Sequence, residues 1–284
     1  MDVIRRREPL RDACDDARLE GRTVGFVPTM GSLHEGHLSL VRKARREADT
    51  VVVSIFVNPL QFGPGEDLDA YPRDTERDLR MLDESKTDLA FLPAVDEMFP
   101  DGRPAVTVDP GALGDVLEGA ARPGHLRGVC TVVAKLLGIV GPCRAYFGEK
   151  DAQQLAVIRR MVEDLDLPVS VIAGETVREP DGVAMSSRNT YLSPEEREAA
   201  RALPRSLAAA AALVGEGEVD ANVLRAEMAK HIGAEPLAEL DYVAVVDEAS
   251  FAEVKTVDGP ARALVAARIG PARLIDNARL ERPR

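Results

Sequence analysis

The chain of 284 residues is poor in cysteine and contains no long hydrophobic run. Its three cysteines, Cys14, Cys130 and Cys143, are an odd number without CxxC spacing, which argues against a disulfide framework and for free thiols in a reducing compartment. No apolar stretch approaches the roughly 20 residues that a membrane-spanning helix needs. The first residues, MDVIRRREPLRD, lack the apolar core of a signal peptide. We therefore expect a cytoplasmic protein without a membrane segment.

Positive charge is also in short supply. The chain has 36 basic and 48 acidic residues and a formal net charge of −12. Such a chain repels a nucleic-acid backbone, so we expect no nucleic-acid partner, and an anionic substrate must be held by a local group of donors. The densest basic run, Arg42 to Arg46, is expected on the solvated face of a helix.

Two common phosphate-binding motifs are missing. The sequence has no GxxxxGK[ST] and no GxGxxG after a strand, which excludes a P-loop and a dinucleotide-binding fingerprint. Any nucleotide site in this chain must be built from other residues.

Over the first two-thirds of the chain, short β-branched runs alternate with helical patterns. Strands are expected to start near Thr23, Val51, Leu89, Arg144 and Val169, with helices over His37–Ala48, Thr75–Glu84 and Gln153–Leu165. This alternation predicts an α/β fold with a Rossmann-like parallel sheet and crossover helices. Ligands of such sheets bind at the carboxyl ends of the strands.

The pattern changes after about Ala173. An alanine-rich helical stretch, interrupted by Pro204, precedes a helix capped by Asp220, and three short β-rich runs follow. We expect a kink or break at Pro204. The chain is thus predicted to form a Rossmann-like domain over residues 1–174 and a smaller α+β domain over residues 175–284.

The first strand is followed by a glycine-rich turn with two histidines, PTMGSLHEGH (Pro28 to His37). Gly31 and Gly36 allow the backbone to approach a ligand closely. His34 and His37 are three residues apart at the start of a helix and share one face, so their N–H groups and the helix N-terminus can bind phosphate oxygens. Two alternatives remain open, a metal-binding HxxH pair and a merely structural pair.

Polar residues follow other strands or begin helices in four further segments. Alone, each is weak evidence, because the glutamines could lie on the surface, Asp151 could cap a helix, and the serine-rich segment could be a linker. Together they place several sets of donors where an open α/β sheet binds ligands. The segments are Asn58–Phe62, Arg122–Gly128, Gly148–Gln154 and Asp181–Asn189.

These segments, in this order, resemble the blocks of the pantoate–β-alanine ligase family. The similar blocks are PTMGSLHEGH, FVNPLQFGPGEDLDAYPR, RPGHLRGVCTVVAKL, YFGEKDAQQ, REPDGVAMSSRN and the ending RIGPARLIDN. The family belongs to the nucleotidyltransferase superfamily that is marked by a HIGH-type histidine pair. The resemblance implies an AMP-forming ligase that joins pantoate to β-alanine through a pantoyl adenylate, uses ATP and Mg²⁺, and acts as a homodimer in the cytoplasm. The first domain would bind ATP and pantoate, and the second would be a lid next to the dimer interface.

The resemblance also implies roles for individual residues. His37, His34 and Lys150 would be catalytic, and Val177 would contact adenine through its backbone. The segment from Met185 to Arg188 resembles the mobile KMSKS segment of tRNA synthetases. The implied ATP-binding residues are Met30, Gly31, Ser32, Leu33, His34, Glu35, Gly36, His37, Gly148, Glu149, Lys150, Asp151, Val177, Met185, Ser186, Ser187 and Arg188. The implied pantoate-binding residues are Gln61, Gln154, Asn58 and Arg122, with Gln61 also near β-alanine.

Three positions depart from the family's usual residues: Ser32, Leu126 and Val183. None of them removes a donor, although Leu126 could alter the packing beside His125. Two other functions stay open from the residues alone, a nucleotidylyltransferase acting on another small acceptor and a nucleotide-sensing module without turnover.

Overall fold

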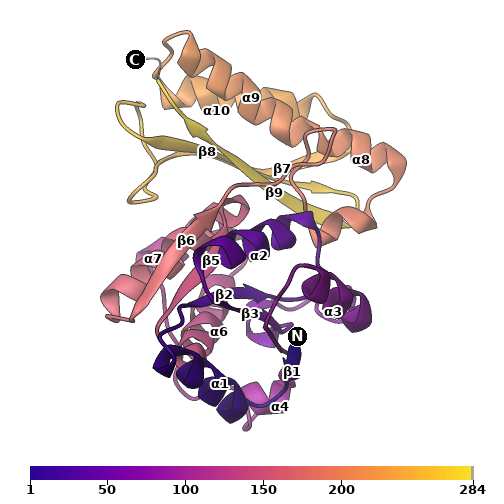
Figure 1. Ribbon diagram of the computed structural model, residues 1–284. Coiled ribbons are helices and arrows are strands. Elements are labelled where there is room, and N and C mark those ends of the chain that lie inside the picture. The colour runs from indigo at the N-terminus through magenta and orange to yellow at the C-terminus, as the bar shows by residue number, and fades with distance from the viewer. Residues whose placement is uncertain (283–284) are drawn as a thin grey trace. The chain divides into compact units, whose positions relative to one another are not determined.

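The computed structural model describes residues 1–282, which fall into two compact units (Figure 1). The first unit comprises Met1–Glu149 and Gln153–Glu175. The second comprises the short segment Lys150–Ala152 and the chain from Thr176 onward. The segment that contains Lys150 therefore groups with the later part of the chain rather than with its sequence neighbours.

A six-stranded sheet forms the centre of the first unit, and each of its pairings is parallel. The order is β1-β4-β3-β2-β5-β6, so the chain adds strands toward one edge and then reverses between β2 and β5. This confirms the predicted parallel sheet. The strands are β1 (Asp2–Ile4), β2 (Val24–Thr29), β3 (Thr50–Ile55), β4 (Leu89–Phe91), β5 (Cys143–Gly148) and β6 (Val169–Gly174).

Helices cover both faces of this sheet. One hydrophobic cluster joins the sheet to α1, α6 and α7, and another joins it to α2 and α3. The α-helices are α1 (Arg7–Leu19), α2 (Glu35–Glu47), α3 (Thr75–Glu84), α4 (Val95–Met98), α5 (Glu118–Ala121), α6 (His125–Val140) and α7 (Ala152–Asp164). The 3₁₀ turns are η1 (Pro59–Gln61), η2 (Gly111–Gly114) and η3 (Glu149–Asp151). Within residues 1–282, no helix combines the length and the apolar character needed to cross a bilayer.

The elements β1 and α1 were not predicted, because their sequence is dominated by charge. Leu10, Cys14 and Ala17 are buried, and their spacing of four and three residues defines a narrow apolar stripe on α1. Pro9 lies in the first turn, where its missing N–H costs little. A short buried stripe therefore docks a helix that is charged on its other faces.

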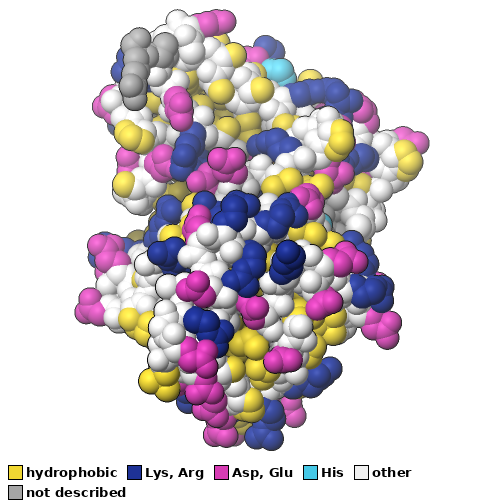
Figure 2. Space-filling model, viewed as in Figure 1, with side chains coloured by type: hydrophobic (Ala, Val, Ile, Leu, Met, Phe, Trp, Pro, Cys, Tyr) yellow, Lys and Arg dark blue, Asp and Glu magenta, His cyan; other side chains and the backbone are white. Residues whose placement is uncertain are grey.

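The basic run Arg42–Arg46 lies on α2, as predicted, and Figure 2 shows Lys and Arg side chains gathered over this helix. Several of these cations already have carboxylate partners in the chain. Arg42 pairs with Glu35, Lys43 Nζ lies 3.3 Å from Glu47 Oε1, and Arg45 Nη1 lies 2.6 Å from Asp88 Oδ2. The run is thus the paired, partly solvated face of a helix.

The second unit is an α+β structure with a three-stranded antiparallel sheet in the order β7-β8-β9. The predicted break occurs at Arg201, where α8 gives way to α9, and Pro204 falls in the first turn of α9. Asp220 caps α10 by accepting a hydrogen bond from the Asn222 N–H. The elements are η4 (Ser187–Tyr191), α8 (Pro194–Ala200), α9 (Ala202–Gly215), α10 (Ala221–Gly233), β7 (Ala238–Asp247), β8 (Ala261–Ile269) and β9 (Ala272–Leu280).

Candidate active site

The turn between β2 and α2 lies at the carboxyl end of a central strand, where a parallel sheet binds ligands. Gly31 has φ +82°, and a Cβ there would lie 2.9 Å from Ile55 Cγ2 and 3.0 Å from Asp78 Oδ2. Only glycine meets both the backbone angle and the lack of space. Met30, Gly31 and Ser32 line a cavity of about 640 Å³ in the first unit. The turn is therefore tightly packed on one side and lines the cavity on the other.

Asp78 of α3 holds this turn in place. Its carboxylate oxygens accept hydrogen bonds from the N–H groups of Ser32 and Leu33, both at 2.8 Å. Arg77 Nη1 donates to the Leu33 carbonyl at 2.9 Å. Burial raises the pKa of Asp78, while the two backbone N–H groups act to lower it. Sequence reasoning missed Asp78, although its spacing of four residues from the buried Leu82 places it on the inner face of the helix.

His34 and His37 lie against each other at the start of α2, with ring centroids 4.1 Å apart. Nδ1 of His34 accepts a hydrogen bond from the Gly36 N–H at 3.2 Å, and Nδ1 of His37 accepts one from the His34 N–H at 3.4 Å. A neutral imidazole that accepts at Nδ1 carries its proton on Nε2. The backbone therefore sets both rings in the Nε2–H form, which presents a donor at the outer nitrogen. Glu35, in the same turn of helix, pairs with Arg42.

Gln61 and Asn58 form a buried pair of amides after β3. Asn58 Nδ2 donates to Gln61 Oε1 at 3.0 Å and to the Gly128 carbonyl at 3.1 Å, and Asn58 Oδ1 accepts from the Leu60 N–H. Gln61 Nε2 donates to the Met30 sulfur at 3.0 Å. The structure thus brings Gln61 beside the turn that carries the histidines. Asn58 is only 1% exposed, and its hydrogen bonds orient the Gln61 carboxamide.

Two side chains, His125 and Arg122, hold the backbone carbonyl of Gln61. His125 Nδ1 lies 2.9 Å from the Gln61 carbonyl and must donate to it, so His125 Nε2 accepts from Arg122 Nη1 at 3.0 Å. Arg122 Nη2 also donates to the Gln61 carbonyl at 3.3 Å and to Glu66 Oε2 at 2.5 Å. His125 is thus in the Nδ1–H form, the opposite of His34 and His37.

Burial and the adjacent Arg122 lower the pKa of His125 to about 4. Burial acts to raise the pKa of Glu66, but the hydrogen bonds and charge of Arg122 outweigh it and lower this pKa to about 2. Near neutral pH, His125 is therefore a neutral imidazole between the Arg122 guanidinium and the Gln61 carbonyl. Glu66 is a carboxylate that pairs with Arg122. Leu126, next to His125, is 1% exposed and packs in the main core.

The turn η1 packs directly on α6, and Gly128 makes this approach possible. A Cβ on Gly128 would lie 2.2 Å from the Leu60 carbonyl oxygen and 2.7 Å from the Gln61 nitrogen. Both are backbone atoms, which cannot move aside without moving the turn. Gly128 is therefore the contact that sets the distance between α6 and Gln61.

Adjacent glutamines in α7 have different surroundings. Gln153 is 3% exposed, accepts from the Glu118 N–H and donates to the carbonyls of Leu113 and Val116. It therefore ties down the segment before α5. Gln154 is half-buried, and its side-chain carboxamide makes no hydrogen bond to any of residues 1–282, so it is available to a ligand. Gly148 and Glu149 precede these residues, at the end of β5 and in η3.

The remaining predicted nucleotide residues lie in the second unit. Asn277 Nδ2 donates to the Lys150 carbonyl at 2.8 Å, and Lys150 Nζ lies 3.7 Å from Asp151 Oδ1. Lys150 and Ser186 line the same narrow hollow. This unit thus brings the predicted lysine beside the serine-rich segment.

The segment from Val177 to Arg188 is a hairpin-like loop. The Met185 N–H donates to the Val177 carbonyl at 3.0 Å, and the Ser186 hydroxyl accepts from the Arg188 N–H at 3.3 Å. Arg178 forms a two-pronged pair with Asp276 of β9, at 2.7 and 3.0 Å. Ser187 is buried at the start of η4. The base of the loop is therefore anchored to the small sheet.

Nowhere in residues 1–282 do three His, Cys, Asp or Glu side chains gather as a group that could hold a metal ion. The histidine pair also uses both Nδ1 atoms for backbone hydrogen bonds. The geometry of the pair suits donation to an oxyanion better than metal ligation.

Comparison with known proteins gives consistent matches over nearly the whole chain. The family model described as pantoate-beta-alanine ligase matches residues 2–279. Pantothenate synthetase of Roseiflexus sp. (strain RS-1) is 57% identical over 281 residues, covering 99% of this chain and 100% of that protein. Pantothenate synthetase of Thermotoga petrophila is 53% identical over 277 residues, which cover 98% of this chain and 99% of that protein.

Two solved structures are also similar. The crystal structure of pantothenate synthetase from Thermus thermophilus has a TM-score of 0.93 and 49% identity, and all of both chains is covered. The pantoate-beta-alanine ligase of Francisella tularensis, complexed with beta-gamma ATP and beta-alanine, has a TM-score of 0.80 and 33% identity. The match covers 98% of this chain and 97% of that chain.

Proposed function

The chain belongs to the pantoate–β-alanine ligase family, and on this premise we propose that it uses ATP to join pantoate to β-alanine, giving pantothenate, AMP and pyrophosphate. The observation that carries the proposal is the buried amide Gln61, held against Met30 beside the His34–His37 pair. A nucleotide site next to a neutral polar pocket is what adenylation of a hydroxy acid needs. The Francisella relative is complexed with beta-gamma ATP and beta-alanine, which supports a nucleotide and β-alanine as ligands of this chain.

In the first step, an oxygen of the pantoate carboxylate attacks the α-phosphorus of ATP and pyrophosphate leaves. Gln61 and Gln154 would hold pantoate through neutral amides, which offer both donors and acceptors to its hydroxyl and carboxylate groups. A lysine or arginine on that carboxylate would pair with it and weaken its attack. Asn58, Arg122 and His125 act through Gln61 rather than on the acid, because their hydrogen bonds are used to orient it.

Negative charge develops on the phosphoryl oxygens, so catalysis depends on donors placed in advance. The Nε2–H groups of His34 and His37 would supply two of them, with His37 as the proton donor. Lys150 and the segment from Met185 to Arg188 would supply the rest, and for this reason we propose that the second unit acts as a lid over ATP. The backbone of Val177 would contact adenine.

Mg²⁺ would enter with the nucleotide. The described residues contain no ready-made metal cluster, and Mg²⁺ in such enzymes is commonly held by substrate phosphates and water with few protein ligands. When bound, it neutralises phosphate charge.

In the second step, the amine of β-alanine attacks the acyl carbon of the pantoyl adenylate. The C–N bond forms, the C–O bond to the phosphate breaks, and AMP leaves with its electron pair. No covalent enzyme intermediate is needed. Gln61 would remain near the amino acid as well as the acid.

We further propose that the protein is a cytoplasmic homodimer with one domain over residues 1–174 and a second over 175–284. The three free cysteines support a reducing compartment, and the dimer rests on the resemblance to the family. Light scattering that gives the mass of a single 30.6 kDa chain at working concentrations would contradict the dimer.

Product analysis with ATP, pantoate and β-alanine tests the reaction. Phosphorus NMR is expected to show AMP and pyrophosphate in equal amounts, and omission of β-alanine should stop pantothenate formation but allow one equivalent of adenylate. ADP and inorganic phosphate as products would refute the adenylate mechanism.

A further inference from the structure

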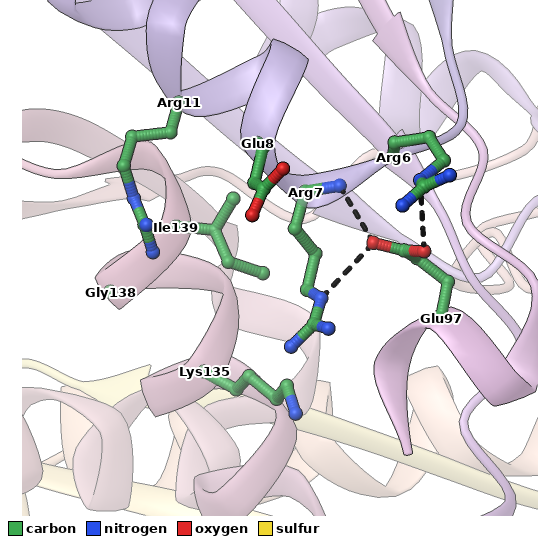
Figure 3. Close-up of a pocket in the computed structure, with 8 residues that line it drawn as sticks. All are labelled: Arg6, Arg7, Glu8, Arg11, Glu97, Lys135, Gly138 and Ile139. Atoms are coloured by element: carbon green, nitrogen blue, oxygen red, sulfur yellow. Dashed lines mark hydrogen bonds and ion pairs between the residues drawn. The ribbon is translucent and has the colours of Figure 1, made fainter. Parts of the chain in front are cut away.

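A cavity of about 380 Å³ opens in the first unit between the start of α1 and the later turns of α6 (Figure 3). Its charged lining consists of four cations and two carboxylates: Arg6, Arg7, Arg11, Lys135, Glu8 and Glu97. The local formal charge is therefore +2, within a chain whose net charge is −12. None of the six is a predicted active-site residue, although Arg6 and Glu97 also line the larger cavity beside Met30.

Glu97 already pairs with two of the cations. Its Oε1 accepts from the Arg7 backbone N–H at 2.9 Å and from Arg7 Nε at 3.1 Å, and its Oε2 lies 3.5 Å from Arg6 Nε. One carboxylate thus serves the N-terminus of α1 and two guanidinium groups. The positive charge around it is only partly compensated.

Among residues 1–282, neither Lys135 nor Arg11 forms an ion pair within 4 Å or a side-chain hydrogen bond. Lys135 Nζ lies 5.4 Å from the centre of the Phe99 ring and makes no hydrogen bond within that part of the chain. Burial and the nearby Arg7 lower the pKa of Lys135, and the charge of Glu97 opposes them only in part. Figure 3 shows the Arg7 guanidinium and the Lys135 ammonium directed toward each other across the cavity. Two like charges that face each other are unfavourable unless an anion lies between them.

We propose that this cavity binds the phosphate group of a small phosphate monoester. A phosphate monoester carries about −1.5 to −2 charges near pH 7, which matches the uncompensated +2, whereas a single carboxylate would leave one cation unpaired. Guanidinium forks and an ammonium group are the side chains that bind phosphate oxygens best. The volume falls within the roughly 300–1,000 Å³ of small-molecule pockets and exceeds what a bare phosphate ion fills.

Protection of Lys135 from acylation tests this site separately from the ATP site. The intact protein is treated with an amine-acylating reagent, and modification of Lys135 is followed by mass spectrometry, with the exposed Lys86 as an internal reference. The probes are ribose 5-phosphate, inorganic phosphate and succinate. At twice the dissociation constant, a bound ligand should slow Lys135 acylation about threefold. Lys86 should react at an unchanged rate.

Arg11→Gln should weaken this protection about tenfold or more, since it removes one charged partner of the phosphate. The matched control is Arg80→Gln on α3, which removes the same charge from an exposed position outside the cavity and should protect as the wild type does. Tighter protection by ribose 5-phosphate than by inorganic phosphate would support a monoester site. Equal protection by ribose 5-phosphate and inorganic phosphate would support a site that binds through the phosphate group alone.

Three results would overturn the proposal. They are no protection of Lys135 by either phosphate up to about 10 mM, equal protection by succinate, or an equal loss in both arginine variants. The last would show that general screening, rather than a bound phosphate, slows the reaction.

Discussion

Substitution of Gly128 by alanine should separate the stability of the fold from the geometry of its acid pocket. The added Cβ would lie 2.2 Å from the Leu60 carbonyl oxygen, whereas ordinary contact begins at 3.4 Å. The turn η1 must therefore retreat from α6 by about 1.2 Å, the difference between these distances. Gln61 ends that turn, so its carboxamide should move with it.

The effect on stability should be small, because two terms oppose each other. Alanine favours a helix interior by about 1 kcal/mol over glycine, while overpacking of this kind costs about 1–3 kcal/mol. The net loss is thus about 0–2 kcal/mol, which lowers the melting temperature of a chain this size by at most about 8 °C. Activity is more sensitive, since a displacement of about 1 Å in a positioned group costs about 10²-fold in rate. We expect kcat/KM for pantoate to fall by about that factor.

The assay is pantothenate formation under varied pantoate, together with a thermal melt of each variant. Gly138→Ala is the matched control, because Gly138 lies on the same helix and a Cβ there meets nothing within 4 Å. This control should melt at or above the wild-type temperature and keep wild-type kinetics. If Gly128→Ala keeps wild-type kcat/KM for pantoate while folded, Gln61 does not act through the position set by α6.

Three further substitutions test the remaining assignments. Lys150→Ala should slow adenylate formation about 10²–10³-fold in single-turnover assays without changing the circular dichroism spectrum, and wild-type kinetics would remove Lys150 from the site. Gln61→Ala and Gln154→Ala should each weaken pantoate binding by about 1–3 kcal/mol in calorimetric titrations and leave the binding of an ATP analogue unchanged. The control Gln153→Ala should mainly destabilise the fold. Equal losses of affinity for pantoate and for the ATP analogue would contradict the assignment of the two glutamines to the pantoate pocket. Folding lowers the pKa of His125 from 6.5 to about 4, so between pH 6.5 and pH 4 the unfolded chain binds more protons at this residue than the folded chain does. The free energy of unfolding is therefore at its full value above pH 6.5 and falls as the pH drops toward 4. His125→Gln should remove up to about 3 kcal/mol of the pH dependence of urea unfolding, and an unchanged dependence would refute the assignment.

The parallel sheet, the helices between its strands and the small second sheet could be predicted from sequence, because their apolar periodicity is strong. The ring contact of His34 and His37 also follows from helical spacing. The roles of Asp78 and Gln153 could not be predicted, because a carboxylate or amide on a charged helix looks solvated until its partners are known. Gln153 and Gln154 differ only by about 100° of helix rotation, which tertiary packing turns into different roles.

The role of Arg122 could not be predicted from its sequence position either. The family resemblance implied a ligand contact for Arg122, but four of its hydrogen bonds lie inside the chain, on Glu66, His125 and the Gln61 carbonyl. An arginine that binds substrate and one that holds a substrate-binding residue have the same sequence pattern. Only the positions of Glu66 and His125 distinguish them.

The reversal of the sheet between β2 and β5 has a consequence for synthesis on the ribosome. Gly25 of β2 pairs with Arg144 of β5, 119 residues later. At about 5–20 residues per second, the edge of β2 waits about 6–24 s for its partner strand to be made. During that time an apolar strand containing Val24, Phe26 and Val27 has an unpaired edge, which is a site for association with other chains. Aggregation of this protein during synthesis should therefore begin at β2, and slower translation of residues 30–144 should increase it because it prolongs the wait for β5.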